Sequence, residues 1–470
     1  MEQMARITFF GAAQEVTGSC HLLDSASTGR ILLDCGMHQG GNAVNRVAKD
    51  SFQFEPASID AVVLSHAHLD HSGLLPKLVH QGFRGLVHCT EATAELLEIM
   101  LYDSIGLYER DLEHKNRQRQ RRGEKKLAPE YVKSDVKKVL KSCKTYQYNK
   151  GQAFQNNATL TFHDAGHILG SAIVEITLNE KDQEKTLVFS GDLGNKNAVL
   201  MNDPAVLTKA DIVLMEGTYG NREHRTIGDT VEQLQTVLQE TWKKKGNVMI
   251  PAFAVGRTQE FLFHLGCLYH EGKLDNWQIY LDSPMAIRVT DVYDRWLRLM
   301  DQRDVKELSD VHKESLQSFL PTLNLTVTPE ESMALNKIKN GAIFIAGSGM
   351  CTGGRIRHHF KHRIWNERNT VIFAGFQAQG TLGRLLVDGI KRIKLYREDY
   401  QVKAKIETLG GFSAHAGQSQ LVEWISQFEN NPQVVLVHGE AEALDVLSQK
   451  LWDDKKIKAE IPKLGQSIAF

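Results

Sequence analysis

The chain has 470 residues, of which 42% are hydrophobic and 24% charged, and its formal net charge at pH 7 is −1. This composition excludes a disordered chain, and no uninterrupted apolar stretch approaches the ~20 residues that a membrane-spanning helix needs. The length predicts two or three domains. The near-zero net charge excludes a general basic bias towards nucleic acid.

The cysteines and the N-terminus indicate the compartment. The six cysteines are scattered and form no C-x-x-C pair. This usage favours a reducing compartment, the cytoplasm, and argues against both a disulfide framework and a thiolate zinc site. The first ten residues have no basic leader ahead of a long apolar stretch, so we interpret them as a first strand and not as a secretion signal.

Short apolar runs alternate with amphipathic segments along the chain, which predicts an α/β fold. Strands are expected at 31–34, 61–65, 159–163, 186–190, 212–216, 247–251, 278–282, 342–346, 370–374 and 433–438. Helices are expected at 92–108, 230–244, 259–270, 286–301 and 419–428.

A basic run follows the first predicted helix. Residues 115–126 read KNRQRQRRGEKK, with seven basic residues and one acidic residue. Such a run attracts phosphates electrostatically. Taken alone, a charge run is more often a solvated face of a helix or loop, and the sequence favours that interpretation here.

The motif HAHLDH (66–71) directly follows a predicted strand. A strand-to-helix turn is where open α/β sheets place their active sites. From such a turn His66 and His68 can face one metal ion, and Asp70 and His71 a second. Imidazole and carboxylate without thiolate favour zinc, with manganese or iron as alternatives. The other interpretation is a surface turn rich in histidine, against which four ligands in six residues argue.

Further ligands are available at the ends of other predicted strands. His167 lies in DAGHILG, Asp192 in FSGDLG and His438 in VVLVHGE. A lone histidine or aspartate at a strand end is more often a turn former or a hydrogen-bonding group. Their position beside glycines, in a chain that also contains HAHLDH, favours metal ligands. Asp192 is the natural carboxylate to bridge two cations.

Taken together, these motifs resemble the metallo-β-lactamase fold. Four further stretches resemble its β-CASP branch, the nucleic-acid-processing nucleases that include the mRNA 3′-end cleavage endonuclease. They are PAFAVGRTQE at 251–260, GSGM at 347–350, GTLG at 380–383 and FSAH at 412–415. The resemblance runs nearly end to end, from GAAQEVTGS at 11–19 to HGE at 438–440.

The resemblance implies an αββα sandwich into which an α/β β-CASP domain is inserted. We expect the sandwich at 1–216 and 396–470 and the inserted domain at 217–395. By the family pattern, two zinc ions, or manganese in their place, are held by seven side chains: His66, His68 and His167 on one ion, Asp70, His71 and His438 on the other, and Asp192 bridging both. Asp34, in LLDCG, matches an acid that orients the metal ligands, a role whose loss is typically costly.

Three positions match the markers of the branch: Glu216, His415 and His438. Glu216 and His415 would form a carboxylate–imidazole pair whose imidazolium can protonate a leaving oxygen. The resemblance thus implies that Asp70, Glu216 and His415 are catalytic. Without it, Glu216 would be read as a capping or salt-bridging acid and His415 as a turn residue. Members specialised for DNA carry an apolar residue at position 438, so His438 favours RNA.

The expected function is a zinc-dependent ribonuclease in which a hydroxide held by the two ions attacks phosphorus in line and leaves a 5′-phosphate. The expected partner is single-stranded RNA, with no membrane, and a homodimer is one assembly left open. The chain ends about thirty residues after His438, which favours a compact, endonuclease-like arrangement. The same centre also suits 5′→3′ exonuclease action. Two alternatives are a DNA nuclease of the branch and a small-molecule hydrolase of lactamase or thioesterase type.

A phosphate-binding site is expected in the inserted domain. A glycine-rich turn at the start of a helix presents backbone N–H groups to a phosphate, although many such turns bind nothing. The resemblance favours a phosphate cradle, with Ser348, Gly349 and Arg355 after the strand at 342–346. Arg257 is similarly placed between a strand and a helix.

Overall fold

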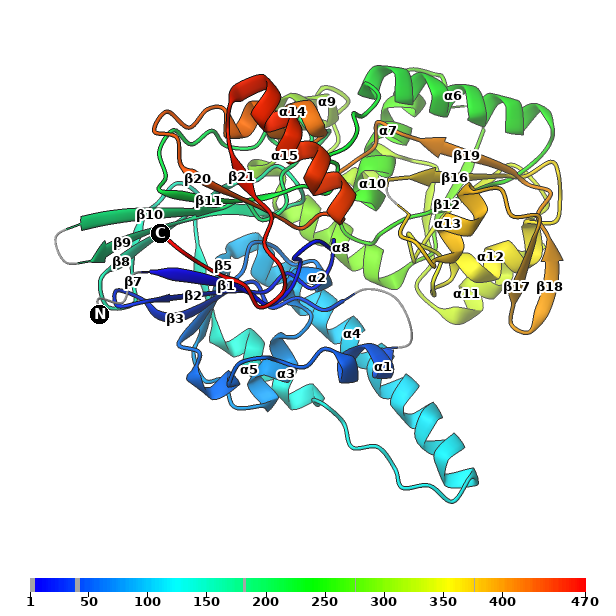
Figure 1. Ribbon diagram of the computed structural model, residues 1–470. Helices are drawn as coiled ribbons and strands as arrows, with labels where there is room; N and C mark the ends of the chain where they lie inside the picture. Colours follow the sequence, from blue (N-terminus) through cyan, green and yellow to red (C-terminus); the bar gives the residue numbers. More distant parts are fainter. Residues whose placement is uncertain (1–4, 39–42, 181–182, 275, 376) are drawn as a thin grey trace. The chain divides into compact units, whose positions relative to one another are not determined.

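The computed structural model describes residues 5–38, 43–180, 183–274, 276–375 and 377–470 (Figure 1). The chain divides into two compact units. The first unit comprises residues 1–196, 203–223 and 415–470, and the second comprises 197–202 and 224–414.

Two seven-stranded sheets form the first unit. In spatial order, the strands of the first sheet are β22 (Ser467–Ala469), β1 (Arg6–Phe9), β2 (His21–Ser25), β3 (Gly29–Leu33), β4 (Ala61–Val63), β5 (Leu86–Thr90) and β6 (Cys143–Tyr146). Those of the second sheet are β21 (Ala459–Glu460), β20 (Gln433–Val437), β11 (Ile212–Glu216), β10 (Gln183–Phe189), β9 (Ala172–Glu180), β8 (Ala158–Asp164) and β7 (Gln152–Phe154).

Each sheet buries both of its faces. Between the sheets lies a core that includes Ile7, Leu33, Val63, Leu187 and Leu214. The first sheet is covered on its outer face by helices, which are α1 (Ala43–Lys49), α2 (Leu69–Ser72), α3 (Leu75–His80), α4 (Glu91–Arg121) and α5 (Lys133–Ser142). The second is covered by α14 (Gln418–Ile425) and α15 (Ala441–Lys455). This layering is the predicted αββα sandwich, and the fold class is confirmed.

The second unit is built on a six-stranded parallel sheet. Its order is β14 (Leu323–Leu325), β13 (Gln278–Leu281), β15 (Ala342–Ala346), β12 (Val248–Pro251), β16 (Thr370–Ala374) and β19 (Lys405–Leu409). A hairpin of β17 (Arg392–Leu395) and β18 (Glu398–Gln401) is separate. The helices are α6 (Ile227–Lys243), α7 (Arg257–His270), α8 (Pro284–Arg295), α9 (Gln302–Asp310), α10 (Leu316–Phe319), α11 (Pro329–Ala334), α12 (Ile356–Arg363) and α13 (Leu382–Val387).

The boundaries between the units differ from those expected. Residues 396–414 were assigned to the sandwich, but β19 pairs with β16 over five residues and therefore belongs to the second unit. Residues 217–223 belong to the first unit, where the Gly217 N–H donates to the carbonyl of His438 at 3.3 Å. Contacts between distant segments, which local sequence does not reveal, set both boundaries.

One helix departs strongly from its expected length. Helix α4 was predicted at 92–108 but continues to Arg121. Its buried residues all lie between Ala92 and Tyr108, so the apolar pattern marks only the packed part of the helix. Among the described residues, no helix combines the length and apolar character needed to cross a bilayer.

Candidate metal centre

Parallel strand pairing gathers the candidate ligands at strand ends. β3 and β4 are parallel neighbours, so Asp34 and the motif at 66–71 leave adjacent carboxyl ends. β10, β11 and β20 are also parallel neighbours, and Asp192, Glu216 and His438 lie at or just beyond their carboxyl ends. The carboxyl edge of parallel strands is the usual location of sites in α/β proteins.

The first cluster comprises His66, His68, His167 and Asp192, whose ligand atoms all lie within 4.8 Å of one another. His68 Nδ1 lies 3.1 Å from His66 Nε2 and 3.3 Å from His167 Nε2. Asp192 Oδ2 lies 3.5 Å from His66 Nε2 and 3.5 Å from His167 Nε2. Ligands held at ~2.0–2.1 Å around a tetrahedral zinc would lie about 3.3 Å apart, so the spacing suits a metal ion.

The second cluster comprises Asp70, His71 and His438 and adjoins the same aspartate. His71 Nε2 lies 3.2 Å from His438 Nε2 and 3.3 Å from Asp192 Oδ2. His438 Nδ1 lies 3.5 Å from Asp192 Oδ1, and its Nε2 lies 4.0 Å from Asp70 Oδ2. The Asp192 carboxylate therefore reaches both clusters, and all seven predicted ligands are gathered in one place.

The protonation states of His66, His68 and Asp192 suit a metal. Burial and the charge of His71 hold the pKa of His66 well below its usual value, and burial lowers the pKa of His68 to about 4. Metals bind the neutral imidazole. Burial opposes ionisation of Asp192, but the neighbouring histidines outweigh it and hold its pKa well below the usual range. At His71 burial also lowers the pKa, but the charges of Asp192 and Asp34 outweigh it and hold the pKa well above its usual value. The ionised Asp192 therefore lies between the neutral rings of His66 and His68 and a charged His71.

Asp34 is fully buried behind His71. Its Oδ2 lies 2.7 Å from His71 Nδ1 and accepts hydrogen bonds from the hydroxyls of Ser19 and Ser65, each at 3.0 Å. The Ser65 N–H donates to Oδ1 at 2.8 Å. A carboxylate at Nδ1 fixes the ring orientation and leaves Nε2 for a metal.

Two glycines permit the close approach of these loops. A Cβ at Gly36 would lie 1.7 Å from the carbonyl oxygen of Asp70. A Cβ at Gly191, whose φ is +53°, would lie 2.7 Å from the Cβ of Ser65. Only glycine fits at these positions without displacing the ligand loops.

Glu216 and His415 form a pair beside the first cluster. Glu216 is fully buried, and its Oε1 lies 3.0 Å from His415 Nδ1 while accepting a hydrogen bond from the Leu193 N–H at 2.7 Å. Burial opposes protonation of His415, but the charge and hydrogen bond of Glu216 outweigh it and raise the pKa to about 9. Because ligand atoms of Asp192, Glu216 and His415 lie within 4.8 Å of one another, the pair holds a proton close to the centre.

Ser19, Ser65 and Thr218 were not predicted as site residues. Thr218 Oγ1 lies 3.2 Å from His438 Nδ1 and donates to the carbonyl of His438 at 3.1 Å. The available signal was proximity, since Ser65 directly precedes HAHLDH and Thr218 follows Glu216 by two residues. Ser19 ends the stretch GAAQEVTGS (11–19), but its partner Asp34 lies 15 residues away, so the stretch does not indicate the contact.

The expected phosphate-binding residues lie in the second unit, after β12 and β15. Arg257 is buried at the start of α7 and pairs with Glu260. Arg355 donates to Asp282 at 2.8 Å and to two backbone carbonyls at 3.0 Å. Ser348 accepts a hydrogen bond from the N–H of Gly353, inside its own loop.

Both arginines therefore already face a carboxylate. Gly349 lies against the aromatic ring of Phe253, which a Cβ would meet at 2.7 Å. To bind a phosphate, Arg257 and Arg355 would have to exchange these internal partners. The phosphate cradle stays a prediction.

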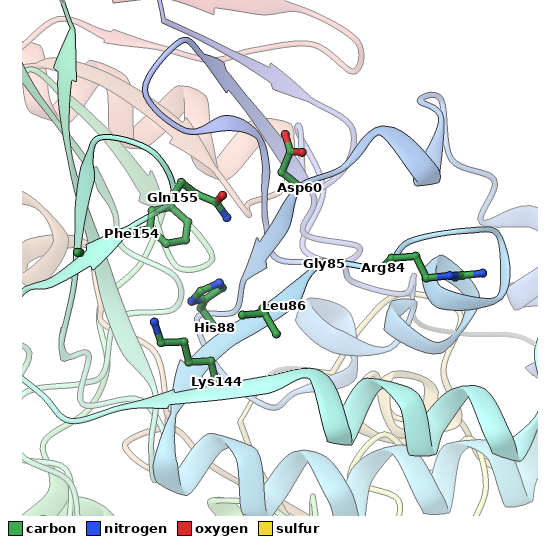
Figure 2. Close-up of a pocket in the computed structure, with 9 residues that line it drawn as sticks. Asp60, Arg84, Gly85, Leu86, His88, Lys144, Phe154 and Gln155 are labelled. Carbon is green, nitrogen blue, oxygen red and sulfur yellow. The ribbon is translucent and has the colours of Figure 1, made fainter.

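A cavity of about 420 Å³ lies at the other end of β4 (Figure 2). Asp60, which precedes β4, lines it with Arg84, His88, Lys144 and Phe154 among others. Since HAHLDH follows the carboxyl end of the same strand, the cavity and the clusters lie at opposite ends of the sheet. None of the predicted site residues lines this cavity.

Three family profiles match successive parts of the chain. The metallo-beta-lactamase superfamily matches residues 13–143, and the Beta-Casp domain matches 258–386. The Zn-dependent metallo-hydrolase RNA specificity domain matches 399–462. These matches span both units.

Individual relatives match nearly the whole chain. Ribonuclease TTHA0252 of Thermus thermophilus is 41% identical over 448 residues, which cover 95% of this chain and 96% of that protein. Transcription termination factor FttA of Methanosarcina mazei is 32% identical, over 98% of this chain and 70% of the relative. An RNase J-like protein of Methanocaldococcus jannaschii is 27% identical, over 98% and 99%.

The fold has also been observed by crystallography. A crystal structure of a protein of unknown function from Enterococcus faecalis V583 covers all of both chains with a TM-score of 0.55 at 14% identity, a likeness that concerns the fold alone. The profiles and the relatives agree with the layered sandwich and its cluster of histidines and aspartates. The chain belongs to the β-CASP branch of the metallo-β-lactamase superfamily and is a metallo-hydrolase.

Proposed function

We propose that this chain is a zinc-dependent ribonuclease that hydrolyses RNA phosphodiester bonds endonucleolytically and leaves 5′-phosphate ends. The observation that carries the proposal is the Glu216–His415 pair, with its carboxylate fully buried, beside two ligand clusters that both adjoin Asp192. Hydrolysis of a phosphodiester needs negative charge screened at phosphorus and a proton for the leaving oxygen. Ions held by the metal ligands would screen the charge, and the Glu216–His415 pair would supply the proton.

Two zinc ions, with manganese as the alternative, would be held by the seven clustered side chains. When bound, the ions would supply an activated water and neutralise charge on the phosphate. Asp34 would keep His71 in its metal-binding orientation through the contact at Nδ1. Asp192 and Asp70 supply the anionic ligands that offset the charge of two divalent ions.

His415 would protonate the departing 3′-oxygen. Glu216 lies 3.0 Å from Nδ1 of the ring and stabilises the imidazolium that would give up the proton. With a pKa raised to about 9, the imidazole carries its proton at neutral pH. Divalent ions in the neighbouring clusters would lower that pKa towards the working pH, where a general acid is most effective.

Relatives support RNA as the substrate. One relative with 41% identity is named a ribonuclease, and another is named RNase J-like. One family profile is described as an RNA specificity domain and spans 399–462, which includes His415 and His438. We further propose that the RNA is single-stranded, because most of the metal ligands are buried and a single backbone approaches them more closely than a duplex can.

The test measures cleavage of labelled RNA together with bound metal for Asp192→Ala and His415→Ala. Asp192→Ala is expected to lose metal and activity together. His415→Ala is expected to retain metal but to cleave about 10²–10⁴-fold more slowly, the usual contribution of a general acid.

His80→Ala is the matched control, because His80 Nδ1 lies 2.7 Å from a carboxylate oxygen of Asp135 in another imidazole–carboxylate pair. That variant is expected to cleave at the wild-type rate. Full cleavage by metal-free Asp192→Ala would overturn the whole proposal. Full cleavage by His415→Ala would overturn only the role of His415.

Endonuclease action is tested with 5′-labelled RNA that carries either a triphosphate or a monophosphate end. Internal fragments from both substrates are expected. Release of mononucleotides from the monophosphate substrate alone would instead indicate a 5′→3′ exonuclease. The same assay on single-stranded DNA distinguishes the DNA nuclease of the same branch.

A further inference from the structure

The distal part of α4 packs only through Leu112, which is partly buried against the core of its layer. The last buried residue of this helix is Tyr108, and no residue from 109 to 130 is buried. At ~1.5 Å per residue the helix continues about 20 Å past Tyr108. Figure 1 shows it extending beyond α3 and α5, two helices of the same layer. We call residues 113–126 the basic arm.

The basic arm is nevertheless held in a defined shape. The Asn116 side chain donates to the carbonyl of Leu127 at 3.1 Å and accepts from its N–H at 2.8 Å. Arg119 donates to the carbonyl of Lys125 at 2.7 Å and pairs with Glu124 at 2.9 Å. The returning segment is thus fastened along one side of the helix, and the opposite side is left to solvent.

That solvent side carries the positive charge. Arg110, His114, Arg117 and Arg121 are spaced as i, i+4, i+7 and i+11 and therefore share a helix face. Residues 113–126 have a net charge of +5 in a chain whose total is −1, so the rest of the molecule is acidic. The Arg117–Glu113 pair at 2.5 Å is more than 60% exposed on both sides. Exposed pairs of this kind are weak and can be exchanged for another anion.

The N-terminal end of α4 lies beside the segment that carries the metal ligand His167. The hydroxyls of Thr90 and Thr93 both donate to the carbonyl of Gly170, at 2.6 and 2.8 Å, three residues after His167. The basic arm begins about 35 Å along the helix from Thr90. An RNA strand bound at the metal clusters could therefore contact the basic arm only through nucleotides far from the cleavage site.

We propose that the basic arm binds the phosphate backbone of RNA at a distance from the metal centre and so increases the affinity for long substrates. This inference rests on the proposed ribonuclease function. Residues 109–130 contain no phenylalanine, tyrosine or tryptophan on which a base could stack. The contact is therefore electrostatic, independent of sequence and sensitive to salt.

The test uses the full chain with a chelator present, so that RNA binds without cleavage. The triple variant Arg117→Gln, Arg121→Gln and Arg122→Gln removes three exposed charges while keeping helix propensity, since Arg and Gln are similar in that respect. The matched control replaces the exposed Lys243, Lys244 and Lys245 by Gln and removes the same charge elsewhere. Affinity for a long and a short single-stranded RNA is measured by fluorescence anisotropy over a range of salt concentrations.

The arm variant is expected to lower the slope of log affinity against log salt by about 2 on long RNA, at ~0.7 per lost phosphate contact. The ratio of wild-type affinity to arm-variant affinity is expected to be about 20-fold larger at ~50 mM than at ~200 mM salt. The control triple variant should keep the wild-type slope. Lysine in place of Gln at the three arm positions should restore affinity.

Two results would overturn the role of the arm. One is an unchanged slope in the arm variant, and the other is an equal deficit on short and long RNA. Loss of binding to anionic vesicles, with RNA binding intact, would assign the arm to a membrane surface and also overturn the proposal. Failure of the wild-type holoenzyme to cleave any RNA would overturn the ribonuclease function instead, so the two failures are distinguishable.

Discussion

At the scale of single residues, the centre depends on groups that do not themselves face the clusters. Asp34 touches His71 at Nδ1 and is held by two serine hydroxyls and a backbone N–H. Its φ of +61° is unusual for a residue other than glycine. His438 has a φ of +49°. Strained backbone at two such positions is typical of a functional site.

Replacing Asp34 by Asn is expected to weaken zinc binding about 10–100-fold, because the amide lacks the charge that orients His71. Competition with a chromophoric chelator measures the change. Asp60→Asn is the matched control, since Asp60 accepts from the Arg30 N–H at 2.8 Å at the far end of β4. Equal zinc affinity in Asp34→Asn and the wild type would contradict the orienting role.

A second prediction concerns pH and His38. Hydrogen bonds to Asp50 at 2.7 Å and Glu15 at 3.1 Å raise the pKa of His38 to about 10. Because this folded-state pKa lies above the unfolded value of ~6.5, the stabilisation is complete below pH ~6.5 and is lost as pH rises through about 10.

His38→Gln is therefore expected to lower the free energy of unfolding at about pH 6 and to make little difference above about pH 10. Urea unfolding of both proteins across this range measures the difference. A deficit that stays the same at every pH would show that His38 stabilises by packing and not through its charge.

At the scale of elements, two glycines in helix interiors stand in opposite surroundings. Gly106 of α4 has nothing within 4 Å of where a Cβ would lie, whereas at Gly266 of α7 a Cβ would meet the Phe319 ring at 2.3 Å. Gly106 lowers the stability of the helix, and no neighbouring group requires a glycine there. Gly266 allows α7 to approach α10 closely.

Gly106→Ala is expected to raise the free energy of unfolding by about 0.5–1 kcal/mol, because alanine is the better helix former. Gly266→Ala is expected to lower it by about 1–3 kcal/mol through overpacking. Urea titration measures both variants, and each serves as the control for the other. A fall in stability for Gly106→Ala would mean that α4 needs the flexibility of glycine at this position.

At the scale of the whole molecule, all seven candidate ligands belong to one of the two units. They come from segments that span His66 to His438, on both sides of the inserted unit. The site therefore forms only when the two sheets of the sandwich are complete. Contacts between segments so far apart in the sequence form slowly and cost conformational entropy. A bound metal stabilises the folded state in which these contacts have formed.

Zinc is expected to raise the unfolding transition of the first unit and to leave that of the second unchanged. Zinc at ~1,000 times its Kd adds about 4 kcal/mol to the state that binds it. Scanning calorimetry with zinc and with a chelator measures the shifts, and Gly266→Ala identifies the second transition by lowering it. In Asp192→Ala neither transition should respond to zinc. An equal shift of both transitions in the wild type would contradict the assignment of the ligands to one unit.

Local sequence patterns were enough to predict the α/β class and the chemical nature of the centre. Buried strands such as β11, β15 and β16 coincide with the predicted ranges because a short apolar run bounded by turn residues is a local signal. The metal-binding role of HAHLDH can be predicted for the same reason, since its four ligands lie within one turn. Glu216 and His415 could be paired only through a family resemblance, because 199 residues separate them.

The tertiary structure decided the rest. Parallel pairing of β10, β11 and β20 brings Asp192, Glu216 and His438 to one edge, and pairing of β19 with β16 moves a domain boundary by about twenty residues. It also decided that Arg257 and Arg355 face carboxylates of their own unit. The length of α4 beyond Tyr108 was hidden because a helix with no buried face leaves no apolar period. Local patterns record what each segment buries, whereas contacts between distant segments exist only after the chain has folded.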